Sequence, residues 1–432
     1  SVLSMRFTFR WPTMCAALLL SLLVGDVQAT VPAPIQVLSP AQPGAPTPIR
    51  FFSQNMSVSG DFAAIGAPHN TGGGSGVAGT AYVFRRTGSN WNFGQALQAP
   101  SPALGDGYGY SVTVVANTLL VGAPFGNDGR GALHIYNNTG SSFQLLQSIA
   151  APIDVPVSGW FGLRSDVDAG WLAIGAPELS GAGAVYMYRF DNLSENWVFH
   201  SKLVSNLVPG ARRFGFALGL RGNQLIVGSP LDEDPSNATG NAYAFSRVGD
   251  GSTAVWTLNQ RFRMTAAQGT NAPLLFGLSL SLDSTGTRLA VGAPQAGALV
   301  GSSVVGAVFV FERSGNIWTQ SARVDSPLGV SGSFGTSVHL QGDLLLGGDP
   351  QGSSTSSVQG AAALFRRQGN GAWTPVESWY RSTGPGSNYG ISAAIAGAQV
   401  LVGDSTADEP GATDRGLVFV QQRDALFRDG FE

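Results

Sequence analysis

The sequence predicts an all-β fold, a seven-bladed β-propeller built from four-stranded antiparallel blades. A Gly-Ala-Pro-like phrase recurs seven times along the 432-residue chain, at intervals of 53 to 64 residues. Each copy lies among short runs of alternating Val, Ile, Phe and Tyr that are separated by turn residues. A repeat of this size indicates one supersecondary unit copied around an axis, and four antiparallel strands in about fifty residues are typical of a propeller blade.

The recurring phrase ends the second predicted strand of each unit. Its clearest form is Val121-Gly122-Ala123-Pro124, and it weakens in the last two units, where Asp349 and Asp404 replace Ala. An aromatic residue followed by Gly opens each unit, except that the first unit has Phe52-Ser53. The residues assigned to this structural signature are Gly66, Pro68, Gly109, Gly122, Pro124, Gly162, Gly175, Pro177, Gly215, Gly228, Pro230, Gly277, Gly292, Pro294, Gly335, Pro350 and Gly390.

The second unit shows the four expected strands most clearly. They cover residues 111–114, 118–122, 131–136 and 143–150. An aromatic residue opens the fourth strand of six units, and we expect it to pack between blades. These residues are Trp91, Phe143, Trp197, Trp256, Trp318 and Trp373. Trp160, Trp171 and Trp379 fall outside this register, and for them a surface role is the alternative to packing.

The two ends of the array predict a closed ring. The seventh unit runs through its third strand, residues 416–420, and has no fourth strand of its own. Residues 35–40 precede the first unit and resemble the fourth strands of other units. We therefore expect this N-terminal strand to complete the last blade, which would close the ring and leave no ring-breaking open edge.

The pairing of Phe-Gly with Gly-Ala-Pro resembles the FG-GAP repeat, as found in the propeller of integrin alpha subunits. Runs such as Gly306-Ala307-Val308-Phe309-Val310-Phe311 are similar to the bacterial secreted branch of that family. The resemblance covers about residues 35 to 420. It implies a seven-bladed propeller that serves recognition or cell adhesion, in a family whose bacterial members mostly have no assigned reaction.

Many FG-GAP repeats hold calcium in an Asp-rich loop between the first and second strands. Calcium prefers six to eight oxygen ligands, mostly carboxylates. In this chain most of these connections are tight hairpins with at most one carboxylate, and only the third unit keeps two, Asp166 and Asp168. We therefore expect no cofactor. Calcium is possible, but the usual cation loops are degenerate. Asp166 and Asp168 are only weak metal candidates.

Composition limits the classes of partner. The net charge of −3 excludes a nucleic-acid footprint by bulk charge, and the charged fraction of 12% with 59 Gly fits many short strands and tight turns. Beyond the N-terminal segment, no stretch is long and apolar enough to span a membrane.

Three parts of the chain are expected. Residues 1–29 read as a signal peptide, with Arg6 and Arg10 before an apolar run and Met5 as a possible true start, so the protein is expected to be exported to the cell envelope or beyond. Residues 30–420 form the propeller. Residues 421–432 form a tail that reads either as a sorting tag or as a frayed end.

The connections after the second and fourth strands are long and varied, and those after the first and third are short. Recognition usually lies in loops on a rigid scaffold, so the long connections indicate the binding face. Two acidic groups there are the candidate ligand-binding residues, namely Asp232 and Asp234 in one, and Asp349, Asp404, Asp408, Glu409 and Asp414 in the other. The alternative is that these are Asx-type turns with solvated charges.

The sequence contains no catalytic motif that we recognise. The four histidines, His69, His134, His200 and His339, fall at different places in four units and are expected to be surface or strand residues. The first expectation is therefore a non-enzymatic recognition or adhesion propeller that binds a protein or glycan. The alternatives are a structural, envelope-associated propeller without a discrete ligand, and a hydrolase whose carboxylates come from several blades.

Overall fold

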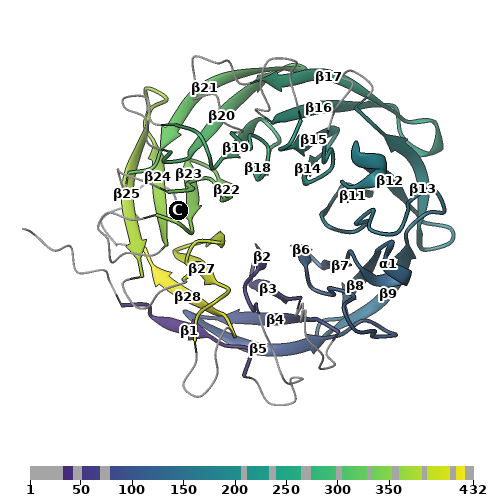
Figure 1. Cartoon of the computed structure of the whole chain (residues 1–432), viewed down its shortest axis with the longest axis horizontal. Coiled ribbons are helices and arrows are strands. Elements are labelled where there is room, and N and C mark those ends of the chain that lie inside the picture. Colours follow the sequence, from purple (N-terminus) through teal and green to yellow (C-terminus); the bar gives the residue numbers. More distant parts are fainter. Residues whose placement is uncertain are drawn as a thin grey trace, which may run out of the picture. The chain divides into compact units, whose positions relative to one another are not determined.

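The computed structural model describes residues 33–41, 51–68, 78–205, 212–232, 240–263, 274–297, 304–327, 332–352, 360–381, 387–408 and 415–423. These residues form seven four-stranded antiparallel sheets, which are arranged as the blades of a ring (Figure 1). The predicted fold class, a seven-bladed β-propeller, is confirmed.

Each blade contributes four strands in sequence order from the axis outward. Blade 1 consists of β2 (Asn55–Ser59), β3 (Phe62–Ala67), β4 (Thr80–Thr87) and β5 (Asn90–Leu97). Blade 2 consists of β6 (Ser111–Val115), β7 (Thr118–Ala123), β8 (Ala132–Asn138) and β9 (Phe143–Ala150). Blade 3 consists of β10 (Ser165–Asp168), β11 (Trp171–Ala176), β12 (Ala184–Asp191) and β13 (Asn196–Leu203). Blades 4 and 5 consist of β14 (Ala217–Arg221), β15 (Gln224–Ser229), β16 (Asn241–Val248) and β17 (Val255–Arg263); and β18 (Leu280–Leu282), β19 (Arg288–Ala293), β20 (Ala307–Ser314) and β21 (Ile317–Asp325).

Blades 6 and 7 follow the same order, with one difference at the end of the chain. Blade 6 consists of β22 (Ser337–Gln341), β23 (Leu344–Asp349), β24 (Ala361–Arg367) and β25 (Trp373–Tyr380). Blade 7 consists of β26 (Ser392–Ala396), β27 (Gln399–Asp404), β28 (Leu417–Gln422) and, as its outermost strand, β1 (Gln36–Leu38). The strands predicted for the second unit agree with β6 to β9 to within two residues at each end.

The N-terminal strand β1 closes the ring as the sequence predicted. It pairs antiparallel with β28, with Gln36 opposite Val420 and Leu38 opposite Val418. Leu38 is buried and belongs to a core cluster that also contains residues of blades 1 and 7. The first and last parts of the propeller are therefore held together by a sheet, and blade 7 has a complete outer edge.

The glycines of the repeat signature meet at the interfaces between blades. Within blade 2, the N–H of Gly109 donates to the carbonyl of Gly122 at 3.0 Å. Between blades, a Cβ on Gly122 would lie 2.0 Å from the carbonyl oxygen of Gly162 in blade 3. The same contact recurs at Gly66, Gly175, Gly228, Gly292 and Gly348, each against the Phe-Gly glycine of the next blade. The two halves of the signature occur together because the glycine of one packs on the backbone of the other.

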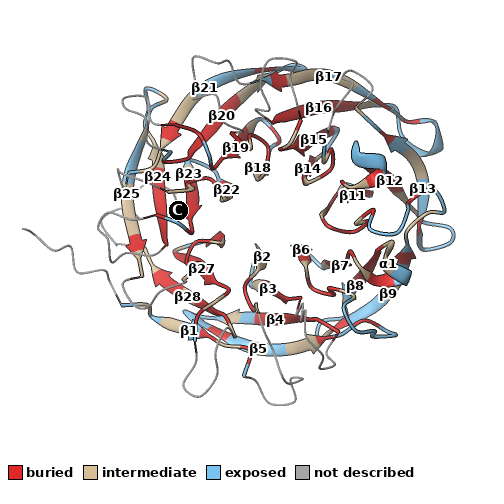
Figure 2. Cartoon of the chain, viewed as in Figure 1, coloured by how far each residue is buried: buried red, intermediate tan, exposed pale blue. Residues whose placement is uncertain are grey.

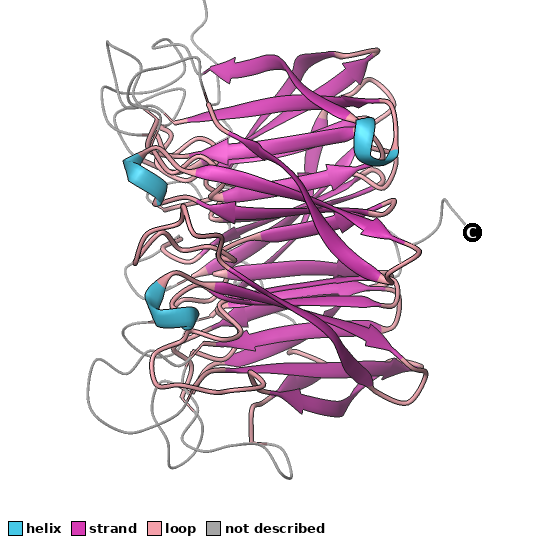
Figure 3. Ribbon diagram, turned by 90° about the vertical axis from the view of Figure 1, so that its right-hand side faces the viewer, coloured by secondary structure: helices cyan, strands magenta, loops and turns pink. Residues whose placement is uncertain are grey.

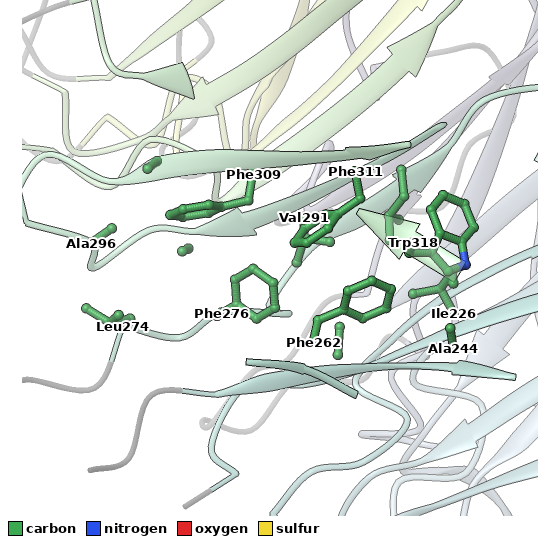
Figure 4. Close-up of a cluster of buried hydrophobic side chains, with 14 of the residues drawn as sticks. Ile226, Ala244, Phe262, Leu274, Phe276, Val291, Ala296, Phe309, Phe311 and Trp318 are labelled. Carbon is green, nitrogen blue, oxygen red and sulfur yellow. The ribbon is translucent and has the colours of Figure 1, made fainter. Parts of the chain in front are cut away.

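Aromatic side chains fill the spaces between adjacent blades. In the cluster between blades 4 and 5, Phe276 of the Phe-Gly pair is fully buried and Phe262 meets Phe311 edge to face at 4.8 Å (Figure 4). Trp318, which opens the fourth strand of blade 5, is buried in the same cluster. The second and third strands of the blades are mostly buried, whereas the outermost strands alternate with exposed residues (Figure 2). Several innermost strands, such as β2, are only half-buried. The packing expected for the fourth-strand tryptophans is thus observed at this interface.

A glutamine on the fourth strand binds the backbone of the next blade at four interfaces. Gln36 donates from Nε2 to the carbonyl of Trp91 at 2.7 Å and accepts from its N–H at 2.8 Å. The equivalent two-bond contacts join Gln95 to Phe143, Gln147 to Trp197, and Gln260 to Trp318. Because Gln36 comes from β1, the interface that closes the ring uses the same contact as interfaces between blades that follow one another in sequence.

The connections divide between two faces. We call the face with the connections after second and fourth strands the long-loop face, and the opposite one the short-turn face. Three short helical turns, which the sequence did not predict, are α1 (Gly126–Gly129), η1 (Leu179–Gly181) and η2 (Gly251–Thr253). Because α1 and η1 follow second strands and η2 follows a third strand, two of the turns should lie on the long-loop face and one on the short-turn face. Figure 3 shows two of them at one edge of the molecule and one at the other. No helix among the described residues is both long and apolar enough for a membrane crossing.

Candidate functional site

Four of the seven acidic residues predicted to bind a ligand are described, and three of these four are buried. Asp404 ends β27 and is fully buried; it accepts hydrogen bonds from Arg381 Nη1 at 2.8 Å and from the N–H of Asn388 at 3.0 Å. Asp349 holds the equivalent place in blade 6 and accepts from the N–H of Ser333 at 2.6 Å. These carboxylates attach the loop that precedes the Phe-Gly pair to the end of the second strand.

The remaining acidic candidates do not form one cluster in the described residues. Asp232 is fully buried and accepts hydrogen bonds from Tyr243 Oη and Asn241 Nδ2 of its own blade. Asp408 is exposed, and Asp234, Glu409 and Asp414 lie outside the described residues. The expectation of solvated charge is wrong for Asp232, Asp349 and Asp404, because loop backbone and side chains cover them. A ligand role for these residues stays a prediction.

Burial of Asp349 has a measurable consequence for stability. Desolvation raises the pKa of Asp349 to about 6, against the hydrogen bonds that favour its charged form. The contribution of Asp349 to the free energy of unfolding is therefore fully present below the pKa of the unfolded state, which is near 4. It is lost as the pH rises through the folded-state pKa of about 6. We expect Asp349→Asn to be more stable than the parent by about 1–3 kcal/mol at pH 7 and equal to it at pH 4. Urea unfolding at the two pH values measures the difference.

The matched control is Asp404→Asn. Asp404 occupies the equivalent position but is paired with Arg381, so removal of its charge leaves a guanidinium without its carboxylate. This variant should be less stable than the parent at pH 7. A loss of stability at pH 7 in Asp349→Asn as well would contradict the assignment of a raised pKa to Asp349.

The two weak metal candidates bind the neighbouring blade. Asp166 accepts from the N–H of Leu220 at 2.7 Å and pairs with Arg221 at 3.1 Å, and Asp168 accepts from the N–H of Gly222 at 2.6 Å. Within the described part of the chain, no group of three or more His, Cys, Asp and Glu side chains is placed to hold a metal ion. The arrangement gives Asp166 and Asp168 a structural role between blades 3 and 4.

A channel of about 400 Å³ runs along the axis of the ring. The innermost strands of all seven blades line it, namely β2, β6, β10, β14, β18, β22 and β26. We number positions on these strands from the Phe-Gly glycine, so that Ser111 is position 2 of blade 2; in blade 1, Ser53 takes the place of that glycine. Because side chains alternate along a strand, positions 2, 4 and 6 share one side. That side faces the channel and the next blade, as the contacts below show.

Polar side chains at position 4 accept hydrogen bonds from the backbone of the innermost strand in the next blade. Ser57 accepts from the N–H of Val114 at 3.0 Å, and Ser281 accepts from the N–H of Leu340 at 3.0 Å. His339 does the same through Nδ1, which accepts from the N–H of Ile395 at 2.7 Å. Each inner strand would otherwise present unpaired N–H groups along its edge. These bonds give the polar side chains at position 4 a structural role between neighbouring blades.

Arg164 interrupts the pattern at position 2. In four other blades this position is a serine that donates to the carbonyl of the next blade's Phe-Gly glycine or, in blade 1, of Ser53; these serines are Ser111, Ser279, Ser337 and Ser392. Arg164 instead lines the channel near its long-loop end and donates from Nη1 to its neighbour's carbonyl, that of Leu163, at 2.9 Å. Burial lowers the pKa of Arg164, and the Tyr110 phenol opposes that effect. No ion pair or other hydrogen bond of its guanidinium occurs within the described residues.

A stack of cations and aromatic rings supports Arg164. Its Cζ lies 5.8 Å from the ring of Phe216, and the Cζ of Arg213 lies at the same distance from that ring. Arg213 also lies 5.3 Å from the ring of Trp160 and pairs with Glu178 at 2.6 Å. Of the two arginines in the stack, only Arg213 has a carboxylate partner. The stack holds the Arg164 guanidinium at the channel wall and leaves its charge uncompensated.

Sequence reasoning missed Arg164 and the stack. Among the three off-register tryptophans, Trp171 and Trp379 are buried, whereas Trp160 is partly exposed and belongs to this stack. A usable signal was present, because position 2 is Ser in four units and Arg in one. The signal becomes meaningful only when the position is known to face the axis.

No protein-family model matches the chain, and no curated protein matches it. Among solved structures, it is similar to a putative 6-phosphogluconolactonase from Bacteroides uniformis, with a TM-score of 0.55, 12% identity and coverage of 85% of this chain and 93% of the other. For a second such protein, from Bacteroides fragilis, the TM-score is 0.54 and the identity 12%, with coverage of 85% of this chain and 92% of the other. For Sqt1 from Chaetomium thermophilum the TM-score is 0.50 and the identity 13%, with coverage of 88% of this chain and 97% of the other. At these identities the likeness shows the fold, a β-propeller.

The comparison corrects the expected function. The prediction of a recognition or adhesion propeller is wrong by this finding, because the structures named above are described as putative 6-phosphogluconolactonases and as Sqt1, and none as an adhesion protein. The alternatives left open by the sequence, which include a propeller hydrolase, agree better with them. Since these neighbours differ among themselves in kind, the function must be argued from the channel of this chain.

Proposed function

We propose that this chain binds a small anionic ligand in the axial channel, with Arg164 as the residue that pairs with the anion. The observation that carries the proposal is the Arg164 guanidinium, which lines the channel and has no carboxylate partner among the described residues. Its stacking neighbour Arg213 is already paired with Glu178. An uncompensated charge in a partly buried site is costly, and a bound anion would offset that cost.

The geometry favours a carboxylate or a phosphate as the group bound. A guanidinium offers a planar fork of N–H donors that matches both groups, and stacking on Phe216 limits its rotation. Two arginines, Arg164 and Arg221, and one carboxylate, Asp166, are the Arg, Lys, Asp and Glu side chains that line the channel in the described residues. The lining therefore carries a net positive charge, opposite in sign to the chain as a whole.

Binding without catalysis is the function that these side chains support best. Asp166 is occupied by Arg221 and by the N–H of Leu220, so it is a poor general base. The acceptor nitrogen of His339 is occupied by the N–H of Ile395. A hydrolase of the kind considered from the sequence would need a free acceptor near the bound substrate. No second carboxylate lines the described part of the channel beside Asp166.

The family and the location remain part of this proposal. The contact of six of the seven Gly-Ala-Pro-like glycines with the next Phe-Gly glycine supports membership of the FG-GAP repeat proteins. Residues 1–29 are proposed to be an export signal and residues 421–432 a tail; the first segment and residues 424–432 lie outside the described residues. A channel open to an extracytoplasmic solution would sample small organic acids there.

Arg164→Ser tests the proposal with a side chain that the chain itself uses at this position. Serine can donate to the next blade's carbonyl as Ser111 does, so the variant should fold. Calorimetric titration with inorganic phosphate and, separately, with acetate should show binding to the parent. The variant should bind at least about tenfold more weakly, since a charge-assisted pair is worth about 1.5–3 kcal/mol. The two titrations distinguish a phosphate site from a carboxylate site.

The control variant is Arg313→Ser. Arg313 also stacks on an aromatic ring, that of Trp318 at 5.8 Å, but it bonds to the hairpin at Gly315 on the short-turn face. Anion affinity should be unchanged in this control. Equal affinity of the parent and Arg164→Ser for both anions, or no binding to either protein, would refute the proposed function.

A further inference from the structure

His339 contributes to the channel wall at position 4 of blade 6. Sibling blades have Ser57, Thr113 and Ser281 at this position, and their hydroxyls bond to the neighbouring inner strand. His339 performs that task with Nδ1, at 2.7 Å from the N–H of Ile395. A serine would be sufficient for the inter-blade bond, so the imidazole supplies a second nitrogen that the task does not require.

The bond to Ile395 determines which nitrogen carries the proton. Because Nδ1 accepts from a backbone N–H, the neutral ring must carry its proton on Nε2. No hydrogen bond of Nε2 occurs within the described residues, and Nε2 is not among their buried unsatisfied atoms. His339 is one of the residues that line the channel. Its Nε2–H is therefore a donor open to the channel.

Arg164 and His339 lie at different depths. Arg164 is at position 2 of its strand and His339 at position 4, so at about 3.3 Å per residue they are about 7 Å apart along the strand direction. They come from blades 3 and 6, which are on opposite sides of the ring (Figure 1). A ligand that pairs with Arg164 and extends along the channel would bring its far part towards His339.

We propose that His339 donates a hydrogen bond from Nε2 to a hydroxyl or carbonyl oxygen of the ligand, so that the channel selects an oxygen-rich acid such as a sugar acid over an aliphatic acid of equal charge. This inference rests on the proposed anion site at Arg164. A site built to hydrogen-bond a substrate hydroxyl discriminates against the analogue that lacks it, because the site's donor is then left unpaired.

A neutral imidazole suits this role. Burial, with the charge of Arg221 on β14 added to it, lowers the pKa of His339 to about 4. The other charged groups that line the channel are Arg164 and Asp166, and Asp166 is paired with Arg221. His339 therefore acts as a polar donor near neutral pH, and Arg164 supplies the charge that the anion needs.

Gluconate and hexanoate are the probes, because both have six carbons and one carboxylate and only gluconate carries hydroxyls. Calorimetric titration should show that gluconate binds the parent more tightly than hexanoate. In His339→Ser, which keeps an acceptor for Ile395 as Ser281 does for Leu340, the ratio of the two affinities should fall by about 3- to 10-fold. Ser281→Ala, a change at the same position of the adjacent blade, is the control and should leave the ratio closer to that of the parent.

The outcomes separate this inference from the proposed function. If phosphate and acetate also fail to bind the parent, the anion site at Arg164 fails and the inference with it. If either of them binds but gluconate does not, only the inference on His339 is overturned. If both bind and His339→Ser leaves their ratio unchanged, only the inference on His339 is overturned. Gluconate affinity should also be constant between pH 5.5 and 8. An affinity that rises as the pH falls through about 6.5, and does so only in the parent, would show an imidazolium that pairs with the anion instead.

Discussion

A variant that lacks residues 30–40 is expected to lose about 5 kcal/mol or more of unfolding free energy, enough to unfold many domains of ordinary stability. The deletion removes the pairing of β1 with β28, the buried side chain of Leu38 and the two hydrogen bonds of Gln36 to Trp91. It also exposes β28 as an open edge, which favours association between chains. Thermal unfolding and size-exclusion chromatography would measure both effects.

Point substitutions in β1 test whether the packing of this strand stabilises the ring, without removal of the whole segment. Leu38 is 2% exposed and Val37 is 44% exposed, although they are neighbours on the same strand. Leu38→Ala should therefore cost about 2–4 kcal/mol, and Val37→Ala should cost less than about 1 kcal/mol. If the deletion leaves the unfolding midpoint unchanged, β1 does not close the ring in solution.

Gly122→Ala is expected to destabilise the protein by about 3 kcal/mol or more. The added methyl would lie 2.0 Å from the carbonyl oxygen of Gly162 and 2.3 Å from Ser111 Oγ, so blades 2 and 3 would have to separate locally. Gly122 does not have a positive φ, so the loss would come from the close approach of backbones and not from conformational strain. Urea unfolding of the parent and the variant measures the loss.

Gly369→Ala is the matched control for this substitution. It adds the same methyl in a turn where nothing lies within 4 Å of the new Cβ, and Gly369 also lacks a positive φ. Its effect should stay within about 0.5 kcal/mol. Similar losses in both variants would mean that the contact between the signature glycines contributes little to the stability of the ring.

The fold could be predicted from the sequence because the same pattern of residues repeats in every blade. Alternating apolar residues and turn residues located β6 to β9, and the missing fourth strand of the last unit located β1. The repeated bulge between third and fourth strands, such as that between Val83 and Phe84, could not be read, because a bulge changes register without changing the composition of either strand.

The site was harder to predict because it depends on which way each residue points. Charge usually indicates exposure, so the sequence predicts Asp349 and Asp404 on a loop surface. In the structure the preceding loop folds over both carboxylates and supplies N–H donors to them. Arg164 carried no motif and became a candidate only once its strand was known to border the axis. The fold depends on what the repeats share, whereas the proposed site depends on a residue in which one repeat differs.

The pairing of β1 with β28 also constrains the order in which the blades can fold. Blade 7 cannot be completed until the last strand is available, and the ring then joins residues from opposite ends of the chain, such as Ser53 and Ser392, 339 positions apart. Contacts over such separations form slowly, because a long loop must close before any of them is gained. During synthesis the N-terminal strand would therefore wait without its partner while six blades assemble, with the outer edge of the first strand and the end of the growing array both exposed. Protection of these edges in the nascent chain is a requirement that follows from the way the ring is closed.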